Sequence, residues 1–310
     1  MYALTPPKPP SIVYTIFGIQ QHAKDTPSPL STQLTALLTP HLPPENTTTL
    51  THPGPGPLTT TIQLTYWPST ADYERWWHSD PVTTFWDALP DDAGIYRETI
   101  TVASDRTQHS TNKPLNIGMG CLGSYTSVLD KSGYWGCYYH RIPATASATG
   151  PEGRLPSPLK GAPKKTEATG GIRQGRVRLT RFPENLCFVV EGQDHSDLTT
   201  AERETWFEKF DAPATGWLSE LQSAGSEKGL LDKRMCYDPR SGKFRDAEPE
   251  AFSFNRKVQL FYFQDMEGME RMGRMSKVHV LLRKEFLKSY GPGGELAGAR
   301  GFICGWRRVF

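Results

Sequence analysis

Hydrophobic and polar residues alternate in several short stretches of this chain, and each such stretch is followed by a helix-like pattern. Residues 61–77 (TIQLTYWPSTADYERWW) and 257–273 (KVQLFYFQDMEGMERMG) share one pattern: an alternating segment, an aromatic turn, and an acidic helix start that carries Glu-Arg. Alternation with a period of two predicts a strand, and apolar residues three to four positions apart predict a helix. The two segments therefore predict two copies of one strand–helix unit.

A second pair of similar segments precedes the first pair. Residues 11–38 and 185–210 each run from an apolar strand through a glycine-containing turn into a polar stretch and an amphipathic helix. In the later segment, Asp197 or Thr199 is placed to cap a helix that opens at Thr200. Two copies of strand–helix–strand–helix predict an α+β fold of two ferredoxin-like halves. We expect a pseudo-symmetric antiparallel β-barrel or sandwich with helices outside, and a pocket between sheet and helices.

Segments rich in proline, threonine and glycine separate these units. Residues 39–61 and 143–175 contain too few large apolar side chains to offset the entropy of an ordered chain, so we predict loops there. The predicted organisation is an N-terminal ferredoxin-like half over 1–142, a loop rich in Pro, Gly and Lys over 143–184, and a C-terminal half over 185–310.

The composition excludes several classes of partner. The 310 residues carry a formal net charge of only +2, and basic and acidic residues are interspersed, which argues against nucleic acid. The 5 cysteines are odd in number and lack metal-site spacing, which is typical of reduced thiols in the cytoplasm. The chain has no apolar stretch long enough to span a membrane. We therefore expect a soluble cytoplasmic protein without a membrane or nucleic-acid partner.

Six blocks of the sequence form an ordered set with a characteristic spacing. They are IVYTIFGIQ (12–20), YWPSTADYERWW (66–77), GIYRETITV (94–102), SGYWGCYYHRIP (132–143), NLCFVVEGQD (185–194) and MERMGRMSKVHVLL (269–282). In order and spacing they resemble the haem-containing aldoxime dehydratases, the family of phenylacetaldoxime dehydratase. The resemblance implies a dimeric-ferredoxin-like α+β fold, haem b with its iron as cofactor, a small-molecule aldoxime as substrate, and a possible homodimer.

One histidine carries the cofactor prediction. A lone histidine beside Val278, Val280 and Leu281 is by itself most simply a partly buried side chain. In the family, however, a histidine just after the Glu-Arg helix of the second repeat holds the haem iron, and His279 stands at that place. A neutral imidazole in an apolar wall is a suitable iron ligand. The resemblance therefore implies that His279 is the cofactor-binding and metal-binding residue.

The residues that perform the chemistry in the family match less well. Loss of water from R–CH=N–OH needs a proton for the departing hydroxide, which the family supplies from a distal histidine assisted by an arginine and a serine. Val190 and Glu191 stand where the family has its arginine. Asp232 or Lys233 stands near the place of the serine, and Cys304 is followed by glycine where the histidine is expected.

These differences leave the activity open. Asp232 and His195 are the remaining candidates for a catalytic proton donor, although the simplest interpretation of His195 is an exposed residue at a helix entry. We predict a haem-dependent lyase that dehydrates aldoximes to nitriles and is impaired because distal residues are missing. The alternatives are a haem-binding protein of the same fold without this activity, and a ferredoxin-like interaction module without haem.

Overall fold

The structure is a computed structural model of the whole chain. It describes residues 2–5, 10–21, 28–54, 58–128, 142–146, 157, 175–299 and 303–309. For residues 303–309 the description covers the backbone. Trp135, His140 and Arg141, which belong to one of the family-like blocks, lie outside these residues.

The first half has the ferredoxin-like succession of strands and helices. Its strands lie in the order β5-β2-β4-β3, and every neighbouring pair is antiparallel. Two helices follow β4 in place of one. The elements are β2 (Ser11–Gln20), α1 (Pro29–Leu38), β3 (Thr47–Pro53), β4 (Thr59–Trp67), α2 (Thr70–Trp77), α3 (Asp80–Asp87) and β5 (Ile95–Ala103).

The second half repeats this arrangement. Its strand order is β9-β10-β8-β11, so β10 holds the place in this half that β4 holds in the first. A π-helical turn over Trp206–Phe210 joins the first two helices. The elements are β8 (Cys187–Asp194), α5 (Thr200–Thr205), α6 (Asp211–Ser223), β9 (Leu230–Tyr237), β10 (Arg256–Phe263), α7 (Met266–Met275), α8 (Lys277–Tyr290) and β11 (Ile303–Val309).

The two half-sheets form one open 11-stranded sheet. They meet where Thr51 of β3 pairs with Tyr237 of β9. Beyond β11, the sheet of the second half is extended by three strands that come earlier in the sequence. They are β6 (Thr107–Thr111), β1 (Tyr2–Leu4) and β7 (Tyr125–Ser127). The predicted antiparallel α+β class is confirmed. Closure into a barrel is not seen in the described residues, because β5 and β7 remain the two edges.

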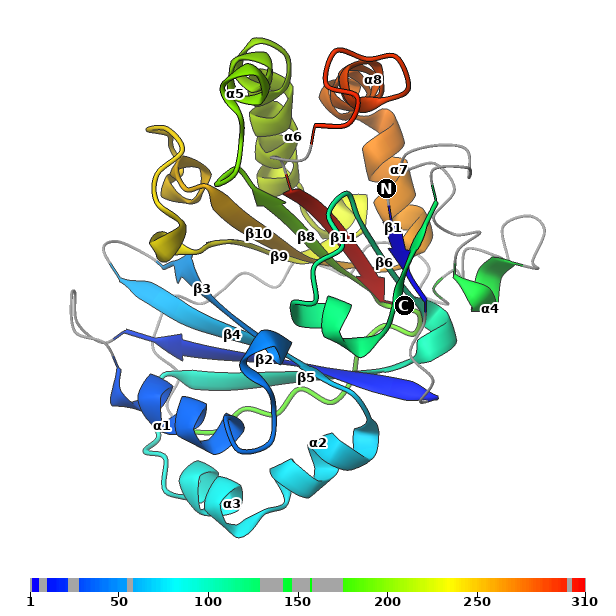
Figure 1. The fold of residues 1–310 in the computed structure, drawn as a ribbon. Coiled ribbons are helices and arrows are strands. Elements are labelled where there is room, and N and C mark those ends of the chain that lie inside the picture. Colours follow the sequence, from blue (N-terminus) through cyan, green and yellow to red (C-terminus); the bar gives the residue numbers. More distant parts are fainter. Residues whose placement is uncertain are drawn as a thin grey trace.

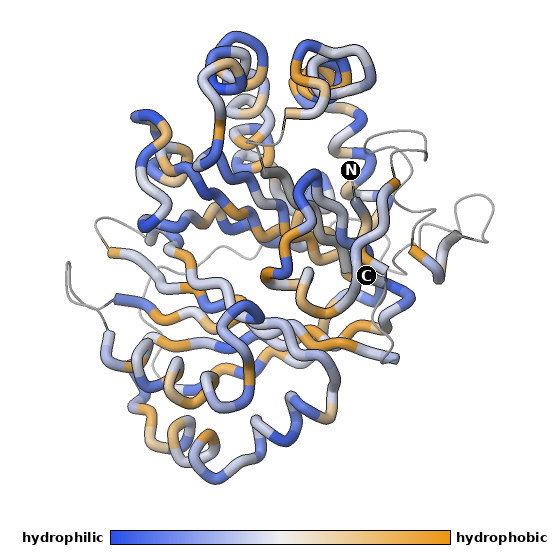
Figure 2. The backbone as a smooth tube through the Cα atoms, viewed as in Figure 1, coloured by the Kyte–Doolittle hydropathy of each residue, from blue (hydrophilic) through white to orange (hydrophobic). Residues whose placement is uncertain are grey.

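The molecule is layered as helix, sheet, sheet and helix (Figure 1). One hydrophobic cluster lies between the two half-sheets and includes Ile16, Leu64 and Leu260. A second cluster packs β2 and β4 against α1, α2 and α3, and Trp76 is fully buried in it. A third lies between the second half-sheet and α6, α7 and α8, and we call it the upper core. In Figure 2, hydrophobic residues recur along the strands, and hydrophobic and hydrophilic residues alternate along the outer helices.

Local sequence signals explain where several elements begin. Thr199, one of the two predicted caps, accepts a hydrogen bond from the backbone N–H of Glu202, whose side chain returns to Thr199 and completes a capping box. The short helix α4 (Pro143–Ala146) and the 3₁₀ turns Pro44–Asn46 and Pro239–Ser241 each begin with proline. Among the described residues, no helix is both long and apolar enough to cross a membrane.

Candidate functional site

His279 lies at the junction of two helices that cover the second half-sheet. α7 ends at Met275, and Ser276 caps the N-terminus of α8 by accepting a hydrogen bond from the backbone N–H of His279 at 3.0 Å. The imidazole is partly buried, with its ring centroid 4.5 Å from that of Trp217 on α6. Three helices therefore fix the position of this side chain at the edge of the upper core.

The hydrogen bond made by the ring decides which nitrogen carries the proton. Nδ1 of His279 lies 2.8 Å from the carbonyl oxygen of Gly273, and a carbonyl only accepts, so Nδ1 is the donor. In the neutral imidazole the lone pair then belongs to Nε2. Histidines that bind metals commonly donate their other ring N–H to a backbone carbonyl in this way.

Gly273 is also a steric requirement of this arrangement. A methyl group added at Gly273 would lie 3.0 Å from Cε1 and 3.2 Å from Nδ1 of His279. The ring therefore occupies the space that any other residue at 273 would need. Among the described residues there is no cluster of three or more His, Cys, Asp or Glu side chains suited to a metal ion. A haem iron needs only an axial ligand from the protein, so His279 and its setting fit this cofactor.

A block of polar side chains occupies the centre of the half-sheet that faces these helices. Side chains alternate between faces along a strand, and Val189 of β8 and Phe261 of β10 belong to the upper core. The residues on the same face are polar and 0–7% exposed. We call them the polar quartet: Glu191 and Gln193 of β8, paired in register with Gln259 and Lys257 of β10.

The quartet is incompletely satisfied. Oε1 of Gln193 and both Oε1 and Nε2 of Gln259 have no hydrogen-bond partner in the described part of the chain. A buried donor or acceptor left in this state typically costs about 1–3 kcal/mol. By contrast, Lys233, which faces the same side from β9, donates to the carbonyl oxygen of Ala224 at 2.5 Å.

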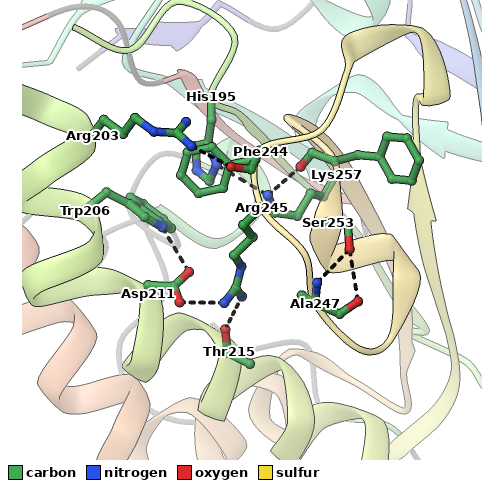
Figure 3. A network of polar contacts seen from close by, with 11 residues as sticks. His195, Arg203, Trp206, Asp211, Thr215, Phe244, Arg245, Ala247, Ser253 and Lys257 are labelled. Carbon is green, nitrogen blue, oxygen red and sulfur yellow. Dashed lines mark hydrogen bonds and ion pairs between the residues drawn. The ribbon is translucent and has the colours of Figure 1, made fainter. Parts of the chain in front are cut away.

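His195 lies at one end of the quartet and is not exposed as expected. Only 2% of its surface is accessible, because the ring packs between Trp206 and Phe244 at centroid distances of 4.3 and 4.2 Å. Nδ1 lies 3.3 Å from Nζ of Lys257, which also donates to the carbonyl oxygen of Phe254 at 2.7 Å. Figure 3 shows this cluster between the sheet and the helices.

Burial determines the charge of both groups. Desolvation, together with nearby Lys257, lowers the pKa of His195 well below its usual value, so the ring is neutral at neutral pH. Desolvation, reinforced by Arg245, lowers the pKa of Lys257 to about 7. Asp211 counteracts this only in part because it binds Arg245 directly, with 2.6 Å between the charged atoms.

His195 and His279 belong to the same layer but to different places in it. Phe286 packs on Phe210, which in turn packs on Trp206 beside His195. Because Phe286 follows His279 by two turns of α8, or about 10 Å along the helix axis, the two histidines are not brought together.

The second candidate donor, Asp232, faces the other side of the sheet. It pairs in register with Tyr262, whose neighbour Phe261 points to the helices, and its carboxylate binds Arg234 at 2.7 Å. Arg234 reaches Glu98 of β5 across the space between the half-sheets, at 2.5 Å. Asp232 therefore belongs to a network that ties the halves together, away from His279.

Val190 also points away from His279. Its side chain belongs to the cluster between the half-sheets and lines a cavity of about 110 Å³ there, together with His109 and Tyr125. An arginine introduced at Val190 would enter this space, so it would not restore a donor opposite His279. The face of the sheet to which Val190 points follows from the strand register and cannot be deduced from the sequence. In β11, the backbone of Gly305 pairs with Gly192 of β8.

A model of the haem-containing dehydratase family matches residues 15–306. The chain belongs to this family. It is 22% identical over 233 residues to the aliphatic aldoxime dehydratase of Rhodococcus globerulus, covering 73% of this chain and 61% of that protein. It is 24% identical over 305 residues to the phenylacetaldoxime dehydratase of Bacillus sp. (strain OxB-1), covering 93% and 81%. The chain thus spans less than two thirds of the length of the Rhodococcus relative.

Solved structures of this family have the same fold. The crystal structure of an aldoxime dehydratase in complex with butyraldoxime superposes with a TM-score of 0.70 at 16% identity, over 99% of this chain and 82% of that one. A second aldoxime dehydratase structure gives a TM-score of 0.69, also at 16% identity. The fold is therefore retained although few residues are shared.

Proposed function

We propose that this protein binds haem b through Nε2 of His279 and dehydrates aldoximes to nitriles. Two observations support the proposal. The chain belongs to the haem-containing dehydratases over residues 15–306. Its family-matched histidine is held by Gly273 and Trp217 in the tautomer that an iron ligand needs. The second of these carries the assignment to His279.

The reaction removes water from R–CH=N–OH. The N–O bond breaks, the carbon-bound proton is lost, and the departing hydroxide takes up a proton to leave as water. Haem held by His279 would supply a ferrous iron that is able to bind the oxime nitrogen and to donate electron density to it. The protein's own residues orient the ligand nitrogen of His279, and the apolar side chains of the upper core, such as Trp217 and Phe261, exclude bulk water.

We propose that neither of the two donors suggested by the sequence, His195 and Asp232, supplies the proton. His195 is neutral and enclosed by aromatic rings, and Asp232 lies on the opposite sheet face in an ion pair. Glu191 is the carboxyl that the polar quartet places on the helix-facing side. We propose Glu191 as the proton donor to the departing oxygen, since a carboxylic acid in a buried setting is able to carry this proton.

A haem-binding protein without turnover is the second candidate function. It is favoured by one observation, that the family-matched position Val190 lies behind the sheet and carries no polar group. A homodimer and a cytoplasmic location remain predictions, and the dimer is measured directly by sedimentation.

The direct test of the proposed function combines two signals. Purified protein is loaded with haem, reduced, and mixed with butyraldoxime or phenylacetaldoxime, while the Soret band and nitrile formation are followed together. A Soret band with nitrile supports the lyase, and a Soret band without nitrile supports the second candidate. Absence of a Soret band after loading would contradict both.

Replacement of the ligand should separate His279 from the other histidines. We expect His279→Ala to lose stoichiometric haem uptake, because no other imidazole is placed beside Gly273 and Trp217 among the described residues. His78→Ala is the matched control, since His78 is exposed on α2 and binds Glu74. Spectrophotometric haem titration measures both. An unchanged Soret position and affinity in His279→Ala would mean that another residue is the ligand.

A further inference from the structure

The internal repeat provides a comparison for Gln259. β4 contains TIQLTYW (61–67) and β10 contains KVQLFYF (257–263), and the two strands hold the same place in their halves. Gln63 and Gln259 are therefore equivalent residues. Both are buried, with 2% and 0% of their surface exposed.

The two glutamines differ in what they bind. Nε2 of Gln63 donates to the Thr35 hydroxyl of the covering helix α1 at 2.8 Å, whereas its Oε1 has no hydrogen-bond partner in the described part of the chain. Gln259 has a bond at neither Nε2 nor Oε1 in the part of the chain that the structure describes. The covering helices of the second half thus provide no polar partner for a side chain whose counterpart in the first half has one.

The surroundings make this difference unusual for a core position. Gln259 pairs with Met235 of β9 on one side and with Glu191 of β8 on the other. Phe261 is the next residue of β10 on the same face. An apolar residue would complete the upper core there without any cost of desolvation. A primary amide is retained instead, next to a buried carboxyl and beneath the helix layer that carries His279.

We propose that Gln259 is the residue that hydrogen-bonds the oxime group of the substrate. This inference rests on the proposed function and deepens it. An oxime hydroxyl both donates and accepts a hydrogen bond, and a primary amide offers one acceptor and two donors at the same place. The substrate would therefore satisfy Oε1 and Nε2 of Gln259 together.

The same chemistry distinguishes substrate from product. A nitrile has an acceptor nitrogen but no donor, so it leaves Oε1 of Gln259 without a partner. Sites built to bind a hydroxyl reject analogues that lack it, because their buried polar groups are then left unpaired. Gln259 should therefore make the affinity for an aldoxime higher than the affinity for the nitrile of the same chain length.

The test uses the haem-loaded ferrous protein and compares Gln259→Met with Gln63→Met. Methionine keeps the shape of glutamine but has no amide. Titration followed at the Soret band should show that Gln259→Met weakens butyraldoxime binding about tenfold or more. Binding of butyronitrile should change much less. Gln63→Met should leave both affinities as in the unmodified protein.

Thermal unfolding without substrate adds an independent readout. Because Gln259 has unsatisfied polar atoms, Gln259→Met should unfold at the same temperature or higher, by about 2–4 °C. Gln63→Met removes a hydrogen bond to α1 and should unfold at a lower temperature. A purely structural role of Gln259 predicts a loss of stability instead.

The outcomes separate this inference from the proposed function. Haem binding with equal aldoxime affinity in Gln259→Met and the unmodified protein would overturn the role of Gln259 alone. A drop in stability of Gln259→Met as large as that of Gln63→Met would also overturn it. Absence of a Soret band in the unmodified protein would overturn the proposed function, and this inference with it.

Discussion

Aldoxime should bind to the haem-loaded ferrous protein quickly, but nitrile should appear slowly. We expect turnover about two to four orders of magnitude below that of the Bacillus relative, which is the usual contribution of a well-placed general acid. Binding and chemistry should therefore separate in time. The measurement is single-turnover mixing with butyraldoxime and phenylacetaldoxime, with the haem spectrum and nitrile recorded on the same samples.

The physical reason lies in where the candidate proton donors are placed. His195, which is buried beside the quartet, is held neutral by burial and by Lys257, so at neutral pH it lacks the second proton that makes an imidazolium a good acid. Asp232 and Val190 point to the opposite face of the sheet. Protonation of the departing oxygen then depends on Glu191, the carboxyl of the polar quartet.

A variant identifies which group limits the rate. If Glu191 supplies the proton, Glu191→Gln should slow nitrile formation further, by about a hundredfold or more, with aldoxime affinity nearly unchanged. Glu204→Gln is the control, because Glu204 is exposed on α5. Nitrile formation by the unmodified protein as fast as in the Bacillus relative would refute the missing-acid argument. An unchanged rate in Glu191→Gln would exclude this carboxyl.

The repeated segments carried most of the information about the fold. The alternating strands and Glu-Arg helix starts predicted two equivalent units, and β4 and β10 occupy the same place in the two strand orders. The short strand β6, with the sequence TQHST, has no apolar alternation, so its pairing with β11 was not readable from the pattern. Pairing of that kind depends on distant backbone, which a local pattern does not record.

The sequence could indicate the position of a candidate site residue only where that residue follows a local pattern, and the role of His279 stays a prediction. His279 follows a recognisable helix, whereas the side of the sheet to which Val190 points depends on register. The burial of His195 depends on Phe244 and Trp206, which are distant in sequence. The sequence does contain an indication of the polar quartet, because glutamine recurs at the same position of two apolar strands, as Gln63 and Gln259. The difference between the two glutamines lies in the hydrogen bond of Gln63 to Thr35, which the sequence pattern does not record.

Lys257 should make the stability of the protein depend on pH in an unusual direction. Its ammonium is enclosed by Phe244 and His195 and is 4% exposed at the residue level, and desolvation with the field of Arg245 lowers its pKa to about 7. An unfolded chain returns the pKa to its ordinary value of 10.5. Between these two values the unfolded state binds a proton that the folded state has released.

Stability therefore rises with pH across this window and is lowest, for this group, below pH 7. The charged groups that also act on Lys257 are Arg245, Asp211 and Asp194. From pH 7 to 9 the contribution of Lys257 should amount to about 2–3 kcal/mol of unfolding free energy.

The test is denaturant unfolding at pH 7 and pH 9 for the unmodified protein, Lys257→Met and Lys243→Met. At pH 7, Lys257→Met should be the most stable of the three, because it removes a buried charge that is only partly compensated. The gain from pH 7 to 9 should be larger in the unmodified protein than in Lys257→Met by the amount given above. Lys243, which is exposed and bound to Asp246, should leave the pH dependence unchanged when replaced. Parallel curves for the unmodified protein and Lys257→Met would show that Lys257 keeps an ordinary pKa, and that the cluster around His195 is open to water.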